Sequence, residues 1–210
     1  MSRLAGVPRG AFLSLFSEEN ELDEGCFVIH EAMQFAATRS WWGKMGPRVR
    51  PHEGLDICRY VRSDGRPMTL CPGVRIPVTF DGDVQAMMAD DFMGRSICVN
   101  HEINGFSFLS VYAHVEPVKG LQVGDRVEKG EVIATLSDPK RWGLAICAHL
   151  HLSLMQTDRK TPESLPENFR WERLWNTPGV SLYNPESLLG RPLTISEDAA
   201  DAMLWQKDER

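Results

Sequence analysis

The central part of the chain alternates short apolar runs with turn residues. From about residue 51 to 158 these runs include "VRIPVTFDGDVQAMMA", "RSICVNHEINGFSFLSVYAHV" and "LAICAHLHLSLMQ", and Asp-Gly, Asn-Gly and Lys-Gly pairs punctuate them. Such a pattern is typical of antiparallel β-strands joined by tight turns. Asn104-Gly105 is the clearest hairpin signal, because a type I′ turn needs positive φ at both central residues. The pattern therefore predicts a mainly β fold with antiparallel sheets.

The two ends of the chain have a different texture. The segment "CFVIHEAMQFAATR" predicts a helix with a loosely apolar face, and the glycines and prolines of "SWWGKMGPRVRP" end it. The C-terminal part is rich in proline and tryptophan and predicts a final short helix, because Thr194 and Glu197 have capping-box spacing. We expect an N-terminal flank over residues 1–50, a β domain over 51–158 and a C-terminal extension over 159–210 that packs on the domain.

Composition narrows the class of protein. A chain of 210 residues with 42% hydrophobic and 25% charged residues is long enough for one sizeable core. The net charge of -6 and the sequence pI of about 5.5 give no basic field for phosphate backbones, so we expect no nucleic-acid partner.

The apolar runs and the cysteines exclude further classes. No run approaches the roughly 20 residues that span a bilayer, and the patch at residues 11–16 is followed by acids, so we expect neither a membrane span nor a signal peptide. Five cysteines without close CxxC spacing argue against a disulfide framework and a thiolate zinc knuckle.

Histidines are concentrated in the stretch "AHLHLS". In a β-strand successive side chains alternate faces, so His149 and His151 would project from one face while Leu150 and Leu152 occupy the other. Two imidazoles placed in this way can serve one metal ion, although an isolated HxH pair in a strand is more often surface or core.

A second group of chemical interest is "RPHEGLDICRY", where His52 and Asp56 are four residues apart. Imidazole nitrogen and carboxylate oxygen are both good zinc ligands, and a catalytic zinc typically keeps three protein ligands and an open position for water. His52, Asp56 and one histidine of the HxH pair would complete such a set.

A fourth histidine is expected to face the same site. In "SVYAHV" alternation places Tyr112 and His114 on one face of a strand, with an apolar face opposite. His101 is the competitor of His114. A two-residue hairpin at Asn104-Gly105 would set His101 opposite Phe108, roughly 20 Å from His114 at about 3.3 Å per residue, so only one of them can lie in the site.

Taken together, these motifs resemble the lysostaphin-type (LytM-type) zinc metallopeptidases, many of which are peptidoglycan endopeptidases. The resemblance covers about residues 50 to 155 and rests on "HEGLDI", "FDGDV", "VNHEINGFSFLSVYAHV", "GLQVGDRVEKGEVIATL" and "HLHLSL", with "YNPESLL" after the core. It differs at "HLHLS", where the family usually has an aromatic and often an acid after the second histidine, and at "RWGLAICAHLHL", which replaces a glycine-rich approach.

The resemblance implies a function and a site. Zn²⁺ would be held by His52, Asp56 and His151, with His149 as the general base and His114 as the group that orients the water or stabilises the oxyanion. The sheets would form an open groove for a short extended peptide, and the enzyme would hydrolyse its amide bonds, those of peptidoglycan cross-links above all, with a zinc-bound water. The family implies the cell envelope, whereas without a clear signal peptide the cytoplasm stays open as a second location.

Other interpretations stay open at this point. The stretch "VKGLQVGDRVEKGEVIATL" also resembles half of a biotinyl or lipoyl carrier domain, a related β architecture in which Lys129 would hold the cofactor. A non-catalytic module that keeps the fold and binds a partner in the groove is another alternative. Cys58 and Cys147 share strand parity with the proposed ligands, so they could ligate zinc, form a disulfide or simply pack. The acidic N-terminal segment could also occlude the groove.

Overall fold

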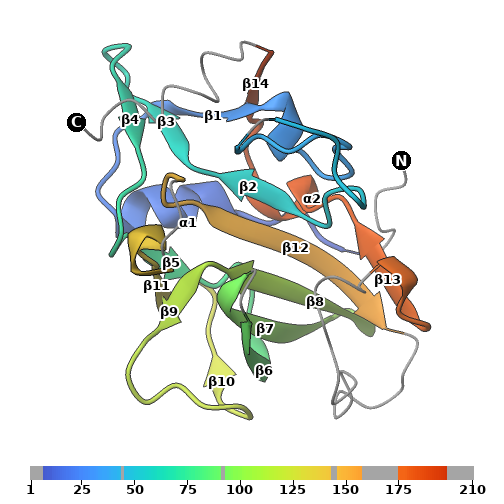
Figure 1. The fold of residues 1–210 in the computed structure, drawn as a ribbon. Helices are drawn as coiled ribbons and strands as arrows, with labels where there is room; N and C mark the ends of the chain where they lie inside the picture. The colour runs from blue at the N-terminus through green and yellow to red at the C-terminus, as the bar shows by residue number, and fades with distance from the viewer. Residues whose placement is uncertain (1–6, 44, 91–92, 143–145, 158–174, 198–210) are drawn as a thin grey trace.

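Antiparallel β-sheets account for most of the regular secondary structure of this computed structural model, which describes residues 7–43, 45–90, 93–142, 146–157 and 175–197 (Figure 1). The elements in chain order are α1 (Phe12–Glu19), β1 (Cys26–His30), η1 (Glu31–Met33), β2 (Leu55–Ile57), β3 (Arg59–Val61), β4 (Pro67–Thr69), β5 (Arg75–Pro77), β6 (Gly82–Asp90), β7 (Gly94–Ile103), β8 (Phe106–Ala113), β9 (Val115–Pro117), β10 (Arg126–Val127), β11 (Val132–Leu136), η2 (Pro139–Trp142), β12 (Leu150–Thr157), β13 (Val180–Tyr183), α2 (Glu186–Leu189) and β14 (Thr194–Ser196). The predicted fold class, mainly β with antiparallel sheets and an open groove, is confirmed.

The largest sheet has seven strands and runs in the order β10-β6-β7-β8-β12-β13, with the short β2 pairing with β12. Its β7–β8 hairpin turns at Asn104 and Gly105, whose φ values of 53° and 76° are those of a type I′ turn. His101 lies directly opposite Phe108 in this hairpin, as the turn length predicts. The hairpin signal in the sequence is therefore confirmed.

Two smaller sheets complete the architecture. A four-stranded sheet in the order β14-β1-β3-β4 lies at the top of the view in Figure 1, and a three-stranded sheet runs β5-β11-β9. Helix α1 packs its aromatic face into the core: the rings of Phe12 and Phe16 are buried, and they contact Tyr112 and Phe27 at centroid distances of 6.1 and 5.7 Å. The N-terminal residues thus form part of the core that supports the largest sheet.

The helix expected over residues 26–39 is wrong. Cys26–His30 form β1, which pairs with β3 and in parallel with β14, and only Glu31–Met33 make a short 3₁₀ turn. The residues alternate between core and outside, because Phe27 and Ile29 are buried while Val28 is half-buried. Aromatic and β-branched residues favour a strand, and two neighbouring strands were there to pair with it.

The C-terminal prediction meets the structure only in part. Thr194 is the first residue of β14 and pairs with Val28, so it does not act as a helix cap. The predicted final helix falls on residues 198–210, which lie outside the described residues. Within the described ranges, no helix has the length and apolar character needed to cross a membrane.

Candidate metal centre

Strand pairing brings together residues that are far apart in the sequence. β2 runs antiparallel to β12, and Asp56 lies directly opposite His151 in this register. His52 precedes β2 in a loop whose backbone is fixed on both sides, since its N–H donates to Ala37 and its carbonyl accepts from Ala36. The approach of the two strands requires Gly54, because a Cβ atom there would lie 2.5 Å from His151 Nε2.

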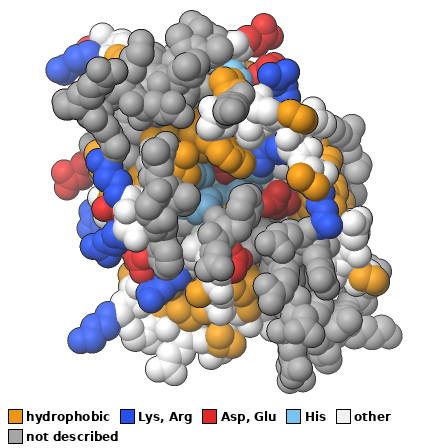
Figure 2. All heavy atoms as spheres, viewed as in Figure 1, with side chains coloured by type: hydrophobic (Ala, Val, Ile, Leu, Met, Phe, Trp, Pro, Cys, Tyr) orange, Lys and Arg blue, Asp and Glu red, His pale blue; other side chains and the backbone are white. Residues whose placement is uncertain are grey.

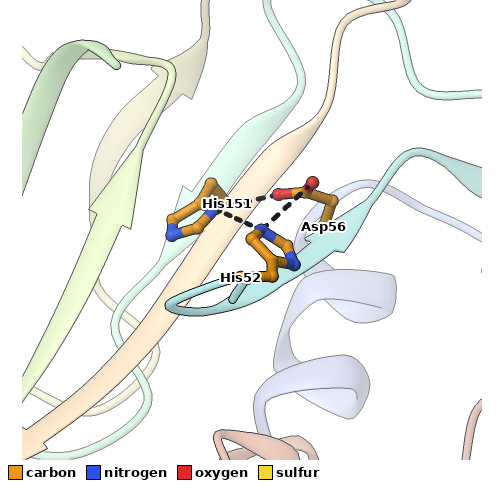
Figure 3. A group of neighbouring side chains, drawn as sticks. All are labelled: His52, Asp56 and His151. Carbon is orange, nitrogen blue, oxygen red and sulfur yellow. Dashed lines mark hydrogen bonds and ion pairs between the residues drawn. The ribbon is translucent and has the colours of Figure 1, made fainter. Parts of the chain in front are cut away.

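The side chains of His52, Asp56 and His151 point toward one another (Figure 3). His52 Nε2 lies 3.2 Å from His151 Nδ1, His151 Nδ1 lies 2.9 Å from Asp56 Oδ1, and His52 Nε2 lies 3.3 Å from Asp56 Oδ2. Ligand atoms around a tetrahedral zinc are about 3.3 Å apart when each sits about 2.0 to 2.1 Å from the ion. The spacing of the three groups therefore fits a shared zinc ion.

Each of the three groups has an outer contact that fixes its orientation. His52 Nδ1 donates to the Gln34 carbonyl over 2.9 Å, which leaves Nε2 as the acceptor that faces the centre. His151 Nε2 lies 2.9 Å from Ser153 Oγ, and Trp41 Nε1 donates to Asp56 Oδ2 over 2.6 Å. Such outer hydrogen bonds set the histidine tautomer and ring direction in metal sites.

The charge state of Asp56 fits the same interpretation. Burial alone would raise the pKa of its carboxyl, but the neighbouring His52 and His151 hold that pKa well below its usual range. An ionised carboxylate and imidazole nitrogens face one another in a buried space, and such a group of acceptors is costly unless a cation or protons compensate it.

Asp56, His151 and Ser153 also follow the order of a serine-hydrolase triad. In that class the serine oxygen attacks the substrate carbonyl, so it must be accessible. Ser153 lies within β12 and is fully buried, and no substrate atom can reach its Oγ. Ser153 is therefore a hydrogen-bond partner of His151 and does not attack a substrate.

His114 and His149 stand beside the three ligand-type residues. The two rings are 4.3 Å apart between centroids, and His149 makes an edge contact with Trp41 at 4.9 Å. The prediction that His114 shares a strand face with Tyr112 is wrong, because β8 ends at Ala113 and His114 adopts a left-handed φ of 59°. This uncommon backbone conformation turns the imidazole toward His149, and strain of this kind clusters at functional sites.

Both of these imidazoles are held in the neutral form. Burial lowers the pKa of His149, and burial together with the neighbouring His149 lowers the pKa of His114 well below its usual range. His149 Nδ1 lies 3.0 Å from the Cys147 carbonyl, which can only accept, so the proton sits on Nδ1. The Nε2 atom of His149 is then a proton acceptor near neutral pH.

The five histidine and aspartate residues line one hollow. Figure 2 shows histidine side chains in pale blue in the middle of this face, with hydrophobic, basic and acidic side chains around them. The same hollow is lined by five residues that the sequence analysis did not single out, namely Trp42, Arg48, Glu53, Met93 and Ile146. Trp42 and Arg48 come from the segment interpreted as a flank, and no motif spacing marks them.

The remaining candidates lie outside the centre. His30 is buried, and its Nδ1 accepts from the Ala32 N–H, which makes it a packed histidine. The Cys58 thiol donates to Met33 Sδ over 3.9 Å, and the neighbouring Cys147 together with burial raises the pKa of Cys58 well above its usual range. Both are free cysteines, and neither belongs to the group of potential ligands among the described residues.

His101, the competitor of His114, is a core histidine. It is fully buried, its Nδ1 donates to the Asp81 carbonyl over 3.0 Å, and its Nε2 lies 2.7 Å from Ser110 Oγ. Burial lowers the pKa of His101 to about 4. The ring is therefore neutral in the folded protein at pH 7.

The buried His101 predicts a stability that falls in acid. The unfolded chain binds a proton at this ring below about pH 6.5 and the folded chain only near pH 4, so the free energy of unfolding decreases as the pH falls between these values. The loss from this group is about 3 kcal/mol over the whole window. Urea denaturation at pH 7 and pH 4.5 should show a smaller loss in His101→Gln than in the unchanged protein. Equal losses would contradict the assignment.

Comparisons with known proteins agree with this geometry. The sequence model of Peptidase family M23 matches residues 61–162. Among solved structures, LytU is 24% identical, with 58% of this chain and 70% of that chain covered and a TM-score of 0.41. EnpA, a prophage-encoded M23 protein from Enterococcus faecalis, is 15% identical over 67% and 85%, with a TM-score of 0.41. A zinc-containing peptidase from Vibrio cholerae is 21% identical over 63% and 34%, with a TM-score of 0.40. None of the curated proteins matches the chain.

The antiparallel sheets and the His-Asp-His group beside a hollow form the arrangement expected of a metallopeptidase. The family match is more specific: residues 61–162 match Peptidase family M23, and the resemblance stated from the sequence is thereby confirmed. The matched segment contains His114, His149 and His151, whereas His52 and Asp56 precede it. The structure joins these two residues to the matched part through the pairing of β2 with β12.

Proposed function

We propose that the chain is a zinc-dependent metalloendopeptidase that hydrolyses amide bonds in short extended peptides, with glycine- or D-amino-acid-containing cross-links of peptidoglycan as the substrate. The observation that carries this proposal is the convergence of His52, Asp56 and His151, whose ligand atoms all lie within 4.8 Å of one another. The group opens on a hollow that also receives His114 and His149.

The ligand set leaves room for catalysis. His52 and His151 would hold the metal through Nε2 and Nδ1, and Asp56 through a carboxylate oxygen, which makes three protein ligands and one open position. Zinc, when bound, polarises a carbonyl group and lowers the pKa of water toward neutrality. The outer contacts with Gln34 and Ser153 keep both imidazoles aimed at the centre before any ion arrives.

The two remaining histidines would move the protons. His149 is the proposed general base, because its Nδ1 proton is held by the Cys147 carbonyl and its Nε2 is available to accept a proton from water. His114 stands next to it and would orient that water or donate to the oxyanion that develops on the scissile carbonyl. The edge of the Trp41 ring keeps His149 in place.

Metal content and metal-dependent hydrolysis test the proposal. Elemental mass spectrometry of the purified protein should find about one zinc per chain, as a three-ligand site of this kind requires. Treatment with a chelator should abolish cleavage of peptidoglycan fragments and glycine-rich peptides, and added zinc should restore it. A protein that takes up no metal when zinc is offered would overturn the proposal and favour the non-catalytic binding module.

A further inference from the structure

The carboxylate of Glu53 lines the hollow and, among the described residues, forms neither a hydrogen bond nor an ion pair. Glu53 follows His52 directly, its residue is only 9% exposed, and it contributes to the same wall as the ligand-type residues. Its carboxylate oxygens are not among the fully buried polar atoms without a partner in the described residues, so they face the open space of the hollow and are available to a ligand from outside.

The neighbouring cation does not satisfy this carboxylate. Arg48 and Glu53 act on each other electrostatically, but they form no ion pair within 4.0 Å. The Arg48 guanidinium is engaged elsewhere: Nε donates to the Arg39 carbonyl over 3.0 Å, Nη2 donates to the Ala32 carbonyl over 3.3 Å, and Nη2 also lies 3.9 Å from Asp56 Oδ2. The ring of Trp42 covers this guanidinium at 4.5 Å. The Arg48 guanidinium is thus held by hydrogen bonds within the protein, whereas the Glu53 carboxylate is not.

Glu53 also stands apart from the metal ligands and the proton-transfer pair. Its carboxylate is outside the group of three that could hold an ion. The carboxylate that acts on both His114 and His149 is that of Asp56, while Glu53 acts on Arg48. Glu53 is therefore the carboxylate of the hollow that neither the potential metal ligands nor the histidine pair engages.

We infer that Glu53 is a specificity-determining residue that binds a primary ammonium group carried on an apolar stem by the substrate peptide. This inference rests on the proposed peptidase function. Trp42, Met93 and Ile146 provide apolar walls in the same hollow, and a lysine-like side chain pairs an apolar stem with a charged end. An ammonium group has three donors and no acceptor, which suits a carboxylate that has no donor of its own.

The test uses the full chain loaded with zinc and capped heptaglycine peptides in which one position is lysine, Nε-acetyllysine or norleucine. The position is moved along the peptide, and mass spectrometry gives kcat/KM for each peptide. At one position, the lysine peptide should be cleaved about 10- to 100-fold more efficiently than the acetylated one, with the difference in KM. Glu53→Gln should remove this preference, so that the lysine peptide and the acetylated peptide are cleaved with similar kcat/KM.

The matched control is Glu102→Gln, which changes an exposed glutamate of β7 and should keep the preference. A preference that survives in Glu53→Gln, or an equal loss for both peptides, would overturn the inference while leaving the peptidase function intact. If the unchanged protein cleaves no peptide, the proposed function fails. Peptide binding, followed by tryptophan fluorescence, then still tests whether Glu53 binds the ammonium group. Binding of the lysine peptide that weakens about 10-fold or more in Glu53→Gln then supports the inference, and equal binding refutes it.

Discussion

Replacing Asp56 with alanine is expected to abolish zinc binding. Structural zinc sites bind with about 10 to 16 kcal/mol through four ligands, so each ligand contributes about 3 kcal/mol or more and its loss weakens binding at least about 100-fold. Asp56 is also the anionic member of the group, and it faces both imidazoles, at 2.9 and 3.3 Å. The variant should contain no stoichiometric metal by elemental mass spectrometry and should not hydrolyse peptides.

His151→Ala should behave in the same way, because His151 lies opposite Asp56 and is the proposed ligand that comes from β12. A matched control is Asp83→Ala, which removes an aspartate of the same sheet whose side chain is 52% exposed and paired with Arg126. This control should keep one zinc per chain. Circular dichroism should show that all three variants are folded. One zinc retained in Asp56→Ala would refute the assignment of the ligand set.

The metal-type residues could be predicted from the sequence because local pattern and strand geometry place them. His149 and His151 stand next to or within β12, and the short loop from His52 to Asp56 leads into β2. What the sequence does not contain is the register between β2 and β12, which sets Asp56 against His151 across 95 positions of chain. The family resemblance implied only that His52, Asp56 and His151 share a metal ion, and neither it nor the spacing predicted this strand register.

His114 shows where strand periodicity stops being informative. Alternation assumes that the extended backbone continues, but β8 ends one residue earlier and a left-handed φ at His114 redirects the ring. Non-glycine residues rarely adopt this conformation, and propensity gives no signal for it. His114 does line the hollow, although the strand geometry from which this position was argued is absent.

The N-terminal segment makes contacts in the site that the sequence pattern does not predict. Trp41 donates to Asp56 and contacts His149, and Arg48 lies within reach of the same carboxylate. These contacts depend on how a loop folds back over β2, and no periodic pattern encodes such a path. Removal of residues 1–45 would expose the groove if this segment occludes it, but it would also remove Phe12 and Phe16 from the core. Truncation is therefore unsuited to testing whether this segment occludes the groove.

Replacing His149 with alanine is expected to leave zinc in place and to lower kcat by about 10² to 10⁴-fold, the usual contribution of a general base. The side chain is buried beside His114, at 4.3 Å between ring centroids, and it is not one of the three groups that converge on the metal position. Its Nε2 is the proton acceptor, because the Cys147 carbonyl holds the proton on Nδ1. The loss should therefore appear in hydrolysis and not in metal content.

The measurement pairs elemental mass spectrometry with peptide hydrolysis on the same preparation of each variant. His101→Gln is the matched histidine control, since His101 is buried far along the hairpin against Asp81 and Ser110 and should retain both zinc and hydrolysis at pH 7. Zinc lost from His149→Ala would make His149 a ligand. Hydrolysis retained with zinc bound would assign the role of general base to His114, whose ring lies 4.3 Å from that of His149 in the same hollow.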